Sequence, residues 1–134
     1  MKRLLVILLA FLLGGSLYAQ QITNASYHTV AHISKDGTIQ DASYHTVGHI
    51  RSDGTVMDAS YQTIGHLYSD GTVQNASYST VGHIRTDGTV MDSSYRTIGH
   101  IREDGTVMDA SYHTIGHAKG ISLAWAALYF FFSN

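Results

Sequence analysis

MDASYHTIGH, residues 108–117, is a ten-residue phrase that occurs six times along the chain in slightly varied form. Three kinds of residue keep a constant step of 17 positions. The Asp-Gly pairs are 36–37, 53–54, 70–71, 87–88 and 104–105. The tyrosines are Tyr27, Tyr44, Tyr61, Tyr78, Tyr95 and Tyr112, and the histidines are His32, His49, His66, His83, His100 and His117. Repeats at a fixed step indicate a small structural unit that buries its apolar face only against its neighbours.

Each 17-residue unit carries the signals of short β-strands and tight turns. Asp-Gly favours a hairpin turn, because glycine readily adopts the positive φ that such a turn needs. The flanking pairs Thr55-Val56 and Thr63-Ile64 are β-branched and favour strands. Asp58-Ala59-Ser60 predicts a bend or bulge, where Asp and Ser side chains satisfy backbone groups. The unit is therefore predicted as strand, bend, strand, hairpin.

Equivalent positions of the units suggest which side chains the fold needs. Tyr61, Thr63 and Gly65 are predicted to share one strand face, with the tyrosine ring over the bare backbone of the glycine. Gln62 occupies a position that varies among polar residues, which predicts that it faces water. The Met57 position alternates between Met and Gln, which indicates a half-buried site.

The first and last units match the inner ones, so neither has the character of a capping repeat. An open stack of hairpins exposes edge strands and normally needs distinct caps. We therefore predict an all-β fold that closes into a ring or shallow barrel of hairpin repeats, in which the two end strands pair with each other. An open solenoid is the alternative.

The first 19 residues have the pattern of a secretory signal peptide. Lys2 and Arg3 precede the apolar run 4–13, and small residues lead to a predicted cleavage site after Ala19. The alternative, a transmembrane helix, needs roughly 20 apolar residues, and this run is shorter. We expect an exported protein that is periplasmic, outer-membrane-associated or secreted. The predicted divisions are a signal peptide (1–19), a β-hairpin repeat domain (20–118) and an apolar C-terminal tail (119–134).

Composition excludes some classes of function. The chain has eight Lys and Arg residues, two of them in the predicted signal peptide, against ten Asp and Glu residues. Because no basic patch is present, nucleic acid is not an expected partner. The chain has no cysteine and no proline. An exported domain of this composition must be stabilised by packing and backbone pairing, since it can form no disulfide.

The tail 121–132, ISLAWAALYFFF, is almost wholly apolar and follows the last repeat directly. Ala124, Ala126, Ala127 and Leu128 favour a helix. A helix that is apolar on every side is buried in protein or lipid. Twelve residues span roughly 18 Å as a helix, which is short for a bilayer core of about 30 Å. We predict that the helix fills the axial hole of the ring, and the alternative is contact with a membrane or an apolar partner.

The repeated histidines, which we call the histidine column, are the strongest candidate for chemistry. Imidazoles arranged around an axis could hold a metal ion. The pairs His28/His32, His45/His49 and His113/His117 also have the spacing of zinc ligands on a helix. On a strand, however, four residues span roughly 13 Å, too far for a shared ion. We expect each imidazole to hydrogen-bond a neighbouring strand or turn, and we predict no metal and no cofactor; a histidine-column metal binder is the weaker alternative.

No catalytic residues are predicted. An active site needs a residue in an unusual environment, whereas every Ser, His and Asp candidate has near-copies in equivalent surroundings. Asn24-Ala25-Ser26 and Asn75-Ala76-Ser77 match the glycosylation pattern. The same position holds aspartate in the other units, so a shared bend-forming role explains both residue types. These aspartates are Asp41, Asp58, Asp92 and Asp109.

The predicted export, the Asp-Gly links and the ASYxTIGHI phrase together resemble the five-fold β-flower family of bacterial proteins. The resemblance covers Gln21 to about Ala118. It implies β-hairpins arranged like petals around a pseudo-symmetry axis in a shallow barrel. The five Asp-Gly links fit five-fold closure, whereas the six ASY phrases leave six-fold closure as the alternative. The family resemblance implies no catalytic residues.

We therefore expect a non-enzymatic, exported structural or binding module of the bacterial envelope. Its partner is expected to be an unidentified protein or small ligand. The alternative is a membrane-associated module that contacts lipid or a partner through Ile121 to Phe132.

Overall fold

The computed structural model describes residues 20–133, so the predicted signal peptide, residues 1–19, lies outside the described residues. The described residues form twelve β-strands and a C-terminal helix. The strands are β1 (Gln20–Asn24), β2 (Thr29–Ile33), β3 (Thr38–Asp41), β4 (Thr46–Ile50), β5 (Thr55–Asp58), β6 (Thr63–Leu67), β7 (Thr72–Asn75), β8 (Thr80–Ile84), β9 (Thr89–Asp92), β10 (Thr97–Ile101), β11 (Thr106–Asp109) and β12 (Thr114–His117), and the helix is α2 (Leu123–Phe131). The predicted all-β fold with an apolar C-terminal helix is confirmed.

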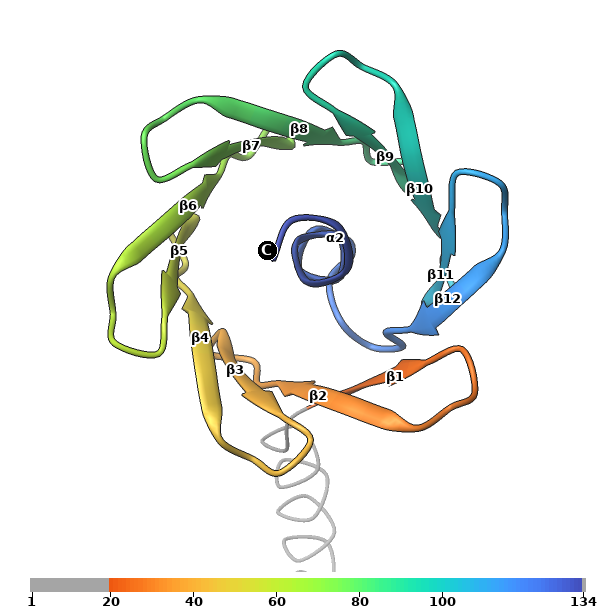
Figure 1. The fold of residues 1–134 in the computed structure, drawn as a ribbon, viewed down its shortest axis with the longest axis horizontal. Coiled ribbons are helices and arrows are strands. Elements are labelled where there is room, and N and C mark those ends of the chain that lie inside the picture. The colour runs from red at the N-terminus through yellow and green to blue at the C-terminus, as the bar shows by residue number, and fades with distance from the viewer. Residues whose placement is uncertain (1–19, 134) are drawn as a thin grey trace, which may run out of the picture.

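The strands form a closed antiparallel barrel in which each strand pairs with its neighbours along the sequence. β1 and β12 complete the closure, with Thr23 opposite His117 and Asn24 opposite Gly116. Figure 1 shows the hairpins arranged around the barrel axis like petals. The predicted closure is confirmed, and it removes the exposed edges that an open stack of hairpins would present.

Two kinds of tight turn, five at the Asp-Gly pairs and six at the repeated tyrosines, have similar geometry. In the Asp-Gly turn, the N–H of Gly54 donates to the carbonyl of Arg51 at 3.0 Å, and in the second turn the N–H of Tyr61 donates to the carbonyl of Asp58 at 3.1 Å. Gly54 has a φ of 92° and Tyr61 a φ of 65°. The second turn joins antiparallel strands β5 and β6. The predicted bend at residues 58–60 is therefore corrected to a hairpin turn, here called the petal turn, which lies at the outer end of each hairpin (Figure 1).

The tyrosine of the petal turn takes a backbone conformation that usually belongs to glycine. All six repeated tyrosines have φ between 65° and 69°, a left-handed conformation that costs roughly 1–2 kcal/mol for a residue with a side chain. The conformation places each ring on a histidine of the adjacent petal. Tyr61 stacks on His49 with ring centroids 4.2 Å apart, and Tyr27 stacks on His117 at 4.0 Å across the closure. The prediction that the tyrosine ring covers a glycine was therefore wrong, because the ring bridges neighbouring petals instead.

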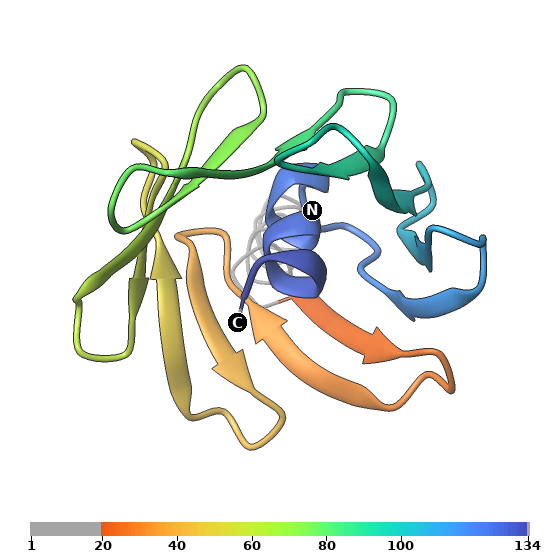
Figure 2. The ribbon, with the colours of Figure 1, turned by 45° about the horizontal axis from the view of Figure 1, so that its top comes forward.

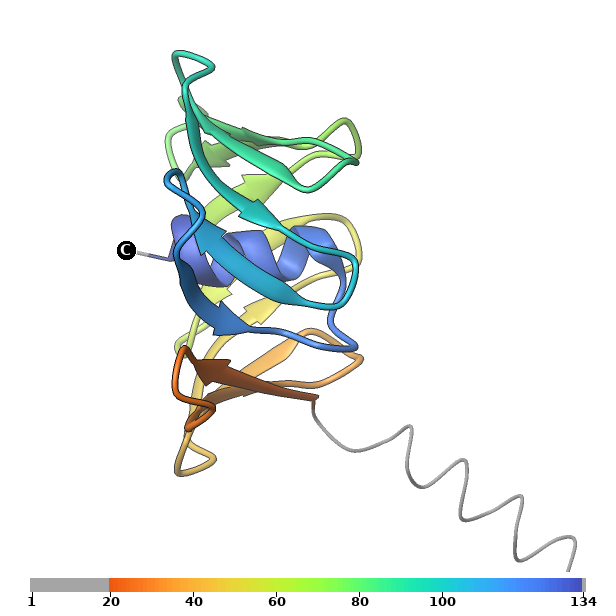
Figure 3. The same cartoon turned by 90° about the vertical axis from the view of Figure 1, so that its right-hand side faces the viewer.

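Helix α2 lies inside the ring, with its axis along the barrel axis. Figure 1 shows it end-on, Figure 3 shows it from the side, and Figure 2 shows the strands surrounding it. Ser122 caps its N-terminus, since its Oγ accepts a hydrogen bond from the N–H of Trp125 at 3.2 Å. Ala126, Ala127 and Leu128 are buried in a core that includes valines and isoleucines of the barrel wall. The helix thus adds its apolar side chains to a core that the strands build from valines and isoleucines.

Three consecutive phenylalanines at the end of α2 lie against glycines of the barrel wall. A Cβ atom built on any of these glycines would lie 2.2–2.5 Å from a phenylalanine ring, closer than side-chain packing allows. The glycines therefore let the rings rest directly on strand backbone. The three pairs are Gly116–Phe130, Gly99–Phe131 and Gly82–Phe132.

Candidate binding cavity

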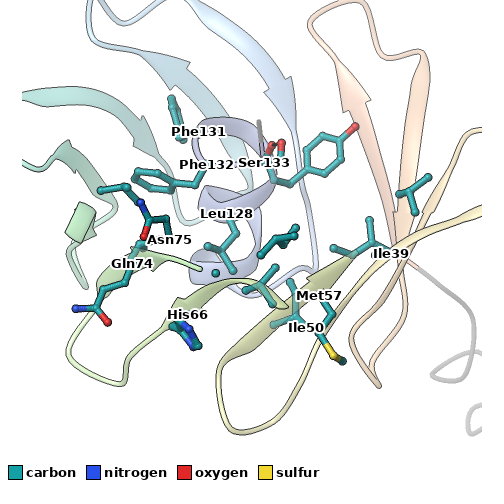
Figure 4. Close-up of a pocket in the computed structure, with 18 of the residues that line it drawn as sticks. Ile39, Ile50, Met57, His66, Gln74, Asn75, Leu128, Phe131, Phe132 and Ser133 are labelled. Atoms are coloured by element: carbon teal, nitrogen blue, oxygen red, sulfur yellow. Dashed lines mark hydrogen bonds between the residues drawn. The ribbon is translucent and has the colours of Figure 1, made fainter. Parts of the chain in front are cut away.

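A cavity of about 570 Å³ lies between α2 and the part of the barrel wall formed mainly by β3 to β8. Figure 4 shows Ile39, Ile50 and Met57 of the wall across the cavity from Leu128 of the helix. The wall is largely aliphatic, whereas the helix contributes Leu128, Tyr129 and the rings of Phe131 and Phe132. The cavity is therefore an apolar space inside the ring that the helix leaves unfilled.

The isoleucine or valine before each glycine shows where the helix covers the wall. Val47 in β4 and Ile64 in β6 are 47% and 49% exposed, and both line the cavity. The equivalent residues of the other four petals are half-buried and pack against the core. These four are Val30, Val81, Ile98 and Ile115. Because the six residues are chemically alike, their difference in exposure comes from the position of the α2 side chains.

A second repeated position shows the same asymmetry. This position directly follows each Asp-Gly-Thr segment. Its residues Val90 and Val107 are fully buried, in the part of the wall that the helix side chains cover. Ile39 and Val56, which line the cavity, are only half-buried, whereas Val73, which lines it at the same repeated position, is buried. Val56 pairs with Gly65 and the next residue, Met57, pairs with Thr63, so Ile64 is the extra residue of a β-bulge in β6. The bulge explains how neighbouring residues Ile64 and Gly65 both line the cavity, because alternation is interrupted there.

The lining of the cavity carries no Asp, Glu, Lys or Arg residue. Its polar side chains are His66, Gln74, Asn75, Tyr129 and Ser133. In Figure 4 the side chains of His66 and Gln74 point away from α2, so they lie at the outer side of the wall. Burial raises the pKa of the Tyr129 phenol above its ordinary value, which keeps this group neutral. The cavity therefore favours neutral apolar molecules over ions.

The histidine column is organised by stacking on tyrosine. All six histidines stack on a tyrosine of an adjacent petal, with centroid distances of 4.0–4.2 Å. The predicted hydrogen bond to a neighbouring strand or turn is not found at Nε2, which is buried without a partner in five of them. These are His32, His49, His66, His83 and His117. The column contributes packing between petals.

Within residues 20–133, no group of three or more His, Asp or Glu side chains is arranged to hold a metal ion. The suggested zinc pairs are not brought together at a common site. His45 and His113 lie in exposed petal turns, where their Nδ1 atoms lie 3.3 Å from Asp41 and Asp109 respectively. Their column partners face the tyrosine stacks instead.

The acidic or amide residue that opens each petal turn holds the turn together. The N–H groups of Ser60 and Gln62 donate to Oδ1 of Asp58 at 2.9 and 3.0 Å. Asn75 accepts the same two bonds from Ser77 and Ser79. The predicted shared role of Asp and Asn is confirmed, and it explains the glycosylation-like pattern by turn geometry. The Gln62 position is exposed in all six petals, as predicted.

These turns lead us to expect a loss of stability in acid. The backbone N–H of His45 donates to the Asp41 carboxylate, and that of Thr38 donates to Asp36. In each case this hydrogen bond is the main cause of a carboxyl pKa below the ordinary value of 3.8. Six further aspartates behave alike, namely Asp53, Asp70, Asp87, Asp92, Asp104 and Asp109. Since the folded pKa lies below the unfolded one, the stabilisation is complete above about pH 4–5 and is lost as pH falls through the folded values. We expect the melting temperature to fall steeply as the pH drops below about 4.

Replacement of Asp41, Asp92 and Asp109 by Asn provides the matched control. Asn24 and Asn75 already form this turn in their own repeats, so the triple variant should fold normally. Its melting temperature should fall less between pH 5 and pH 3 than that of the parent chain. An equal fall in both proteins would show that the petal-turn carboxylates do not cause the acid sensitivity.

Comparison with known proteins gives one finding about the family. A family profile described as "5-fold beta-flower protein" matches residues 19–134 of this chain. Neither the search of curated proteins nor that of solved structures gave a match. Within the described residues, no helix has the length and apolar character required to cross a membrane.

Proposed function

The chain belongs to the 5-fold beta-flower family, and from this premise we propose that it is a non-enzymatic binding module that holds a small neutral apolar ligand inside its barrel. The observation that carries the proposal is the cavity beside α2. Its volume of about 570 Å³ lies in the range of about 300–1,000 Å³ that is usual for small-molecule sites. Val47 and Ile64, about half exposed, present aliphatic side chains to this space.

The remaining parts of the proposal concern export and symmetry. The pattern of residues 1–19 supports export to the bacterial envelope. The six tyrosine–histidine stacks and the twelve strands support six repeats around an approximate six-fold axis, one more than the family description names. The absence of disulfides suits a domain stabilised by closure and by the α2 core.

Titration with a neutral fluorescent dye, N-phenyl-1-naphthylamine, tests the binding function. We expect saturable binding of one dye per chain with a dissociation constant in the range of about 1–100 μM, as for a small apolar ligand in a preformed cavity. Ile64→Trp fills the cavity from an exposed wall position and should weaken binding by about tenfold or more. The measurement is dye emission against protein concentration.

Arg51→Trp is the matched control, because Arg51 is exposed on an Asp-Gly turn and does not line the cavity. It adds the same indole to the surface and should leave dye binding unchanged. If the dye does not bind saturably, or if Ile64→Trp binds it as well as the parent chain does, the cavity is not a binding site.

A further inference from the structure

The glycines of the barrel wall form a repeated position, here called the glycine column, that is covered unevenly. It consists of Gly48, Gly65, Gly82, Gly99 and Gly116, with Ala31 in the remaining petal. Three of these glycines carry a phenylalanine ring of the chain's own C-terminal segment. The rings belong to Phe130, Phe131 and Phe132. Three successive petals thus each bind one ring, supplied by three consecutive residues.

The next two glycines in the series have no ring over them. A Cβ built on Gly65 meets only the carbonyl oxygen of Gln74, at 3.0 Å. One built on Gly48 meets the carbonyl oxygen of Met57 at 2.9 Å and Cδ1 of Ile39 at 3.8 Å. Both glycines line the cavity. The residue that follows the phenylalanines is Ser133, whose hydroxyl donates to the carbonyl of Tyr129, so the series of rings on glycines ends with Phe132 on Gly82.

We propose that the ligand carries planar aromatic rings that lie on Gly48 and Gly65, as the phenylalanine rings lie on the other three glycines. This inference rests on the proposed binding function and specifies the class of ligand. A flat ring can approach strand backbone that bears no Cβ, whereas a saturated ring is thicker and cannot come as close. Gly48 and Gly65 are buried in the wall like the other three glycines, and the repeat makes them near-copies of the three that carry a ring. The chain's own rings therefore show what this wall accepts.

The surroundings of the two glycines match such a ligand. Val47 and Ile64, each next to a glycine that carries no ring, present exposed aliphatic surface to the edges of a bound ring. The ring of Phe132, which covers Gly82, also lines the cavity and can meet a ligand ring edge to face. No ionised side chain lines the space, so the ligand is neutral.

A pair of alcohols with the same carbon skeleton tests the proposal on the mature full-length chain. Biphenyl-4-ylmethanol has two planar rings, and bicyclohexyl-4-ylmethanol is its saturated counterpart. We measure how each displaces N-phenyl-1-naphthylamine, and we expect the aromatic alcohol to bind about tenfold more tightly. General hydrophobicity would give the opposite order, because the saturated compound is the less soluble one in water.

Substitutions in the glycine column locate the binding. Gly65→Ala places a methyl group where the ring would lie and should weaken binding of the aromatic alcohol by about tenfold. Gly48→Ala should act in the same direction, but its methyl group would also lie 2.9 Å from the backbone carbonyl oxygen of Met57, so Gly65→Ala is the cleaner variant. Binding of the saturated alcohol should change little. Ala31→Gly makes the reverse change at a position that does not line the cavity, and it should leave both affinities unchanged.

The outcomes separate this inference from the proposed function. Equal affinity for the two alcohols, together with normal dye binding, overturns the aromatic inference and leaves the cavity as an apolar binding site. Failure of the dye and of both alcohols to bind overturns both. A dimer that binds none of the three would show that a second copy occupies the cavity, and it would also overturn the inference. The comparison of the two alcohols on the parent chain remains decisive if an alanine variant does not fold.

Discussion

A chain that ends at Lys119 is expected to lose its cooperative unfolding transition. The truncation removes α2 and with it the buried side chains of Ala126, Ala127 and Leu128. It also removes the three phenylalanine rings from the glycine column. Loss of one buried leucine side chain such as Leu128 costs about 2–5 kcal/mol, and a whole domain is stable by only about 5–15 kcal/mol. Circular dichroism during heating measures the effect, and we expect either no sigmoidal transition or a midpoint lower by more than about 15 °C.

A chain that lacks only Ser133 and Asn134 is the control, and it should melt like the full chain. Membrane fractionation of the same proteins tests the alternative role of the tail. If the truncation at Lys119 is folded with an unchanged melting temperature, and the full chain alone sediments with membranes, Ile121 to Phe132 form a membrane contact. In that case the proposal that α2 is a structural plug of the barrel is wrong.

The repeat and the apolar tail allowed much of the fold to be predicted. A step of 17 residues with two β-branched segments per unit leaves room for only short strands and tight turns. Similar first and last units indicate closure, because neither end is built to be exposed. The helix follows from residues 121–132, which are too apolar to lie free in water. These predictions depend on composition and periodicity, and the same pattern recurs in every repeat.

The petal turn could not be predicted in the same way. Tyrosine rarely adopts positive φ, so a tyrosine in the fourth position of a turn gives no turn signal of the kind that Gly54 gives. The compensating contact joins different petals: Tyr61 meets His49 of the preceding unit. The constant tyrosine and histidine positions were visible in the sequence. Their pairing across petals was not, because it depends on the register between strands.

The cavity escaped prediction because it arises from a mismatch between two parts of the chain. The six petals are near-copies, whereas α2 has no repeat and covers only part of the wall. Nothing in a single unit distinguishes Val47 and Ile64 from their equivalents in other petals. The sequence did contain a usable signal, because the glycine column holds five glycines whereas the tail holds only three consecutive phenylalanines. Two glycines are therefore left without a phenylalanine ring. That signal has meaning only once the rings are known to lie on the glycines.

Gly116→Ala is expected to destabilise the protein by about 2 kcal/mol, the usual cost of overpacking a core. The new methyl carbon would lie 2.5 Å from the ring of Phe130 and 2.6 Å from the carbonyl oxygen of Thr23. Phe130 does not line the cavity, so we expect its ring to have little room to move away from the new methyl group. A loss of this size lowers the melting temperature by roughly 10 °C in a domain of this length. Thermal and urea unfolding of the parent and the variant measure it.

Two comparisons assign the effect to the ring. Gly65→Ala adds the same methyl group where no ring lies, with its nearest contact at 3.0 Å, and it should change stability by less than about 1 kcal/mol. Phe130→Ala removes the ring, and Gly116→Ala should then cost clearly less in that background than in the parent chain. A coupling of this kind is expected only between residues in contact. If Gly116→Ala costs the same with and without Phe130, the clash is with the backbone of Thr23, and the packing of rings on glycines does not stabilise the barrel.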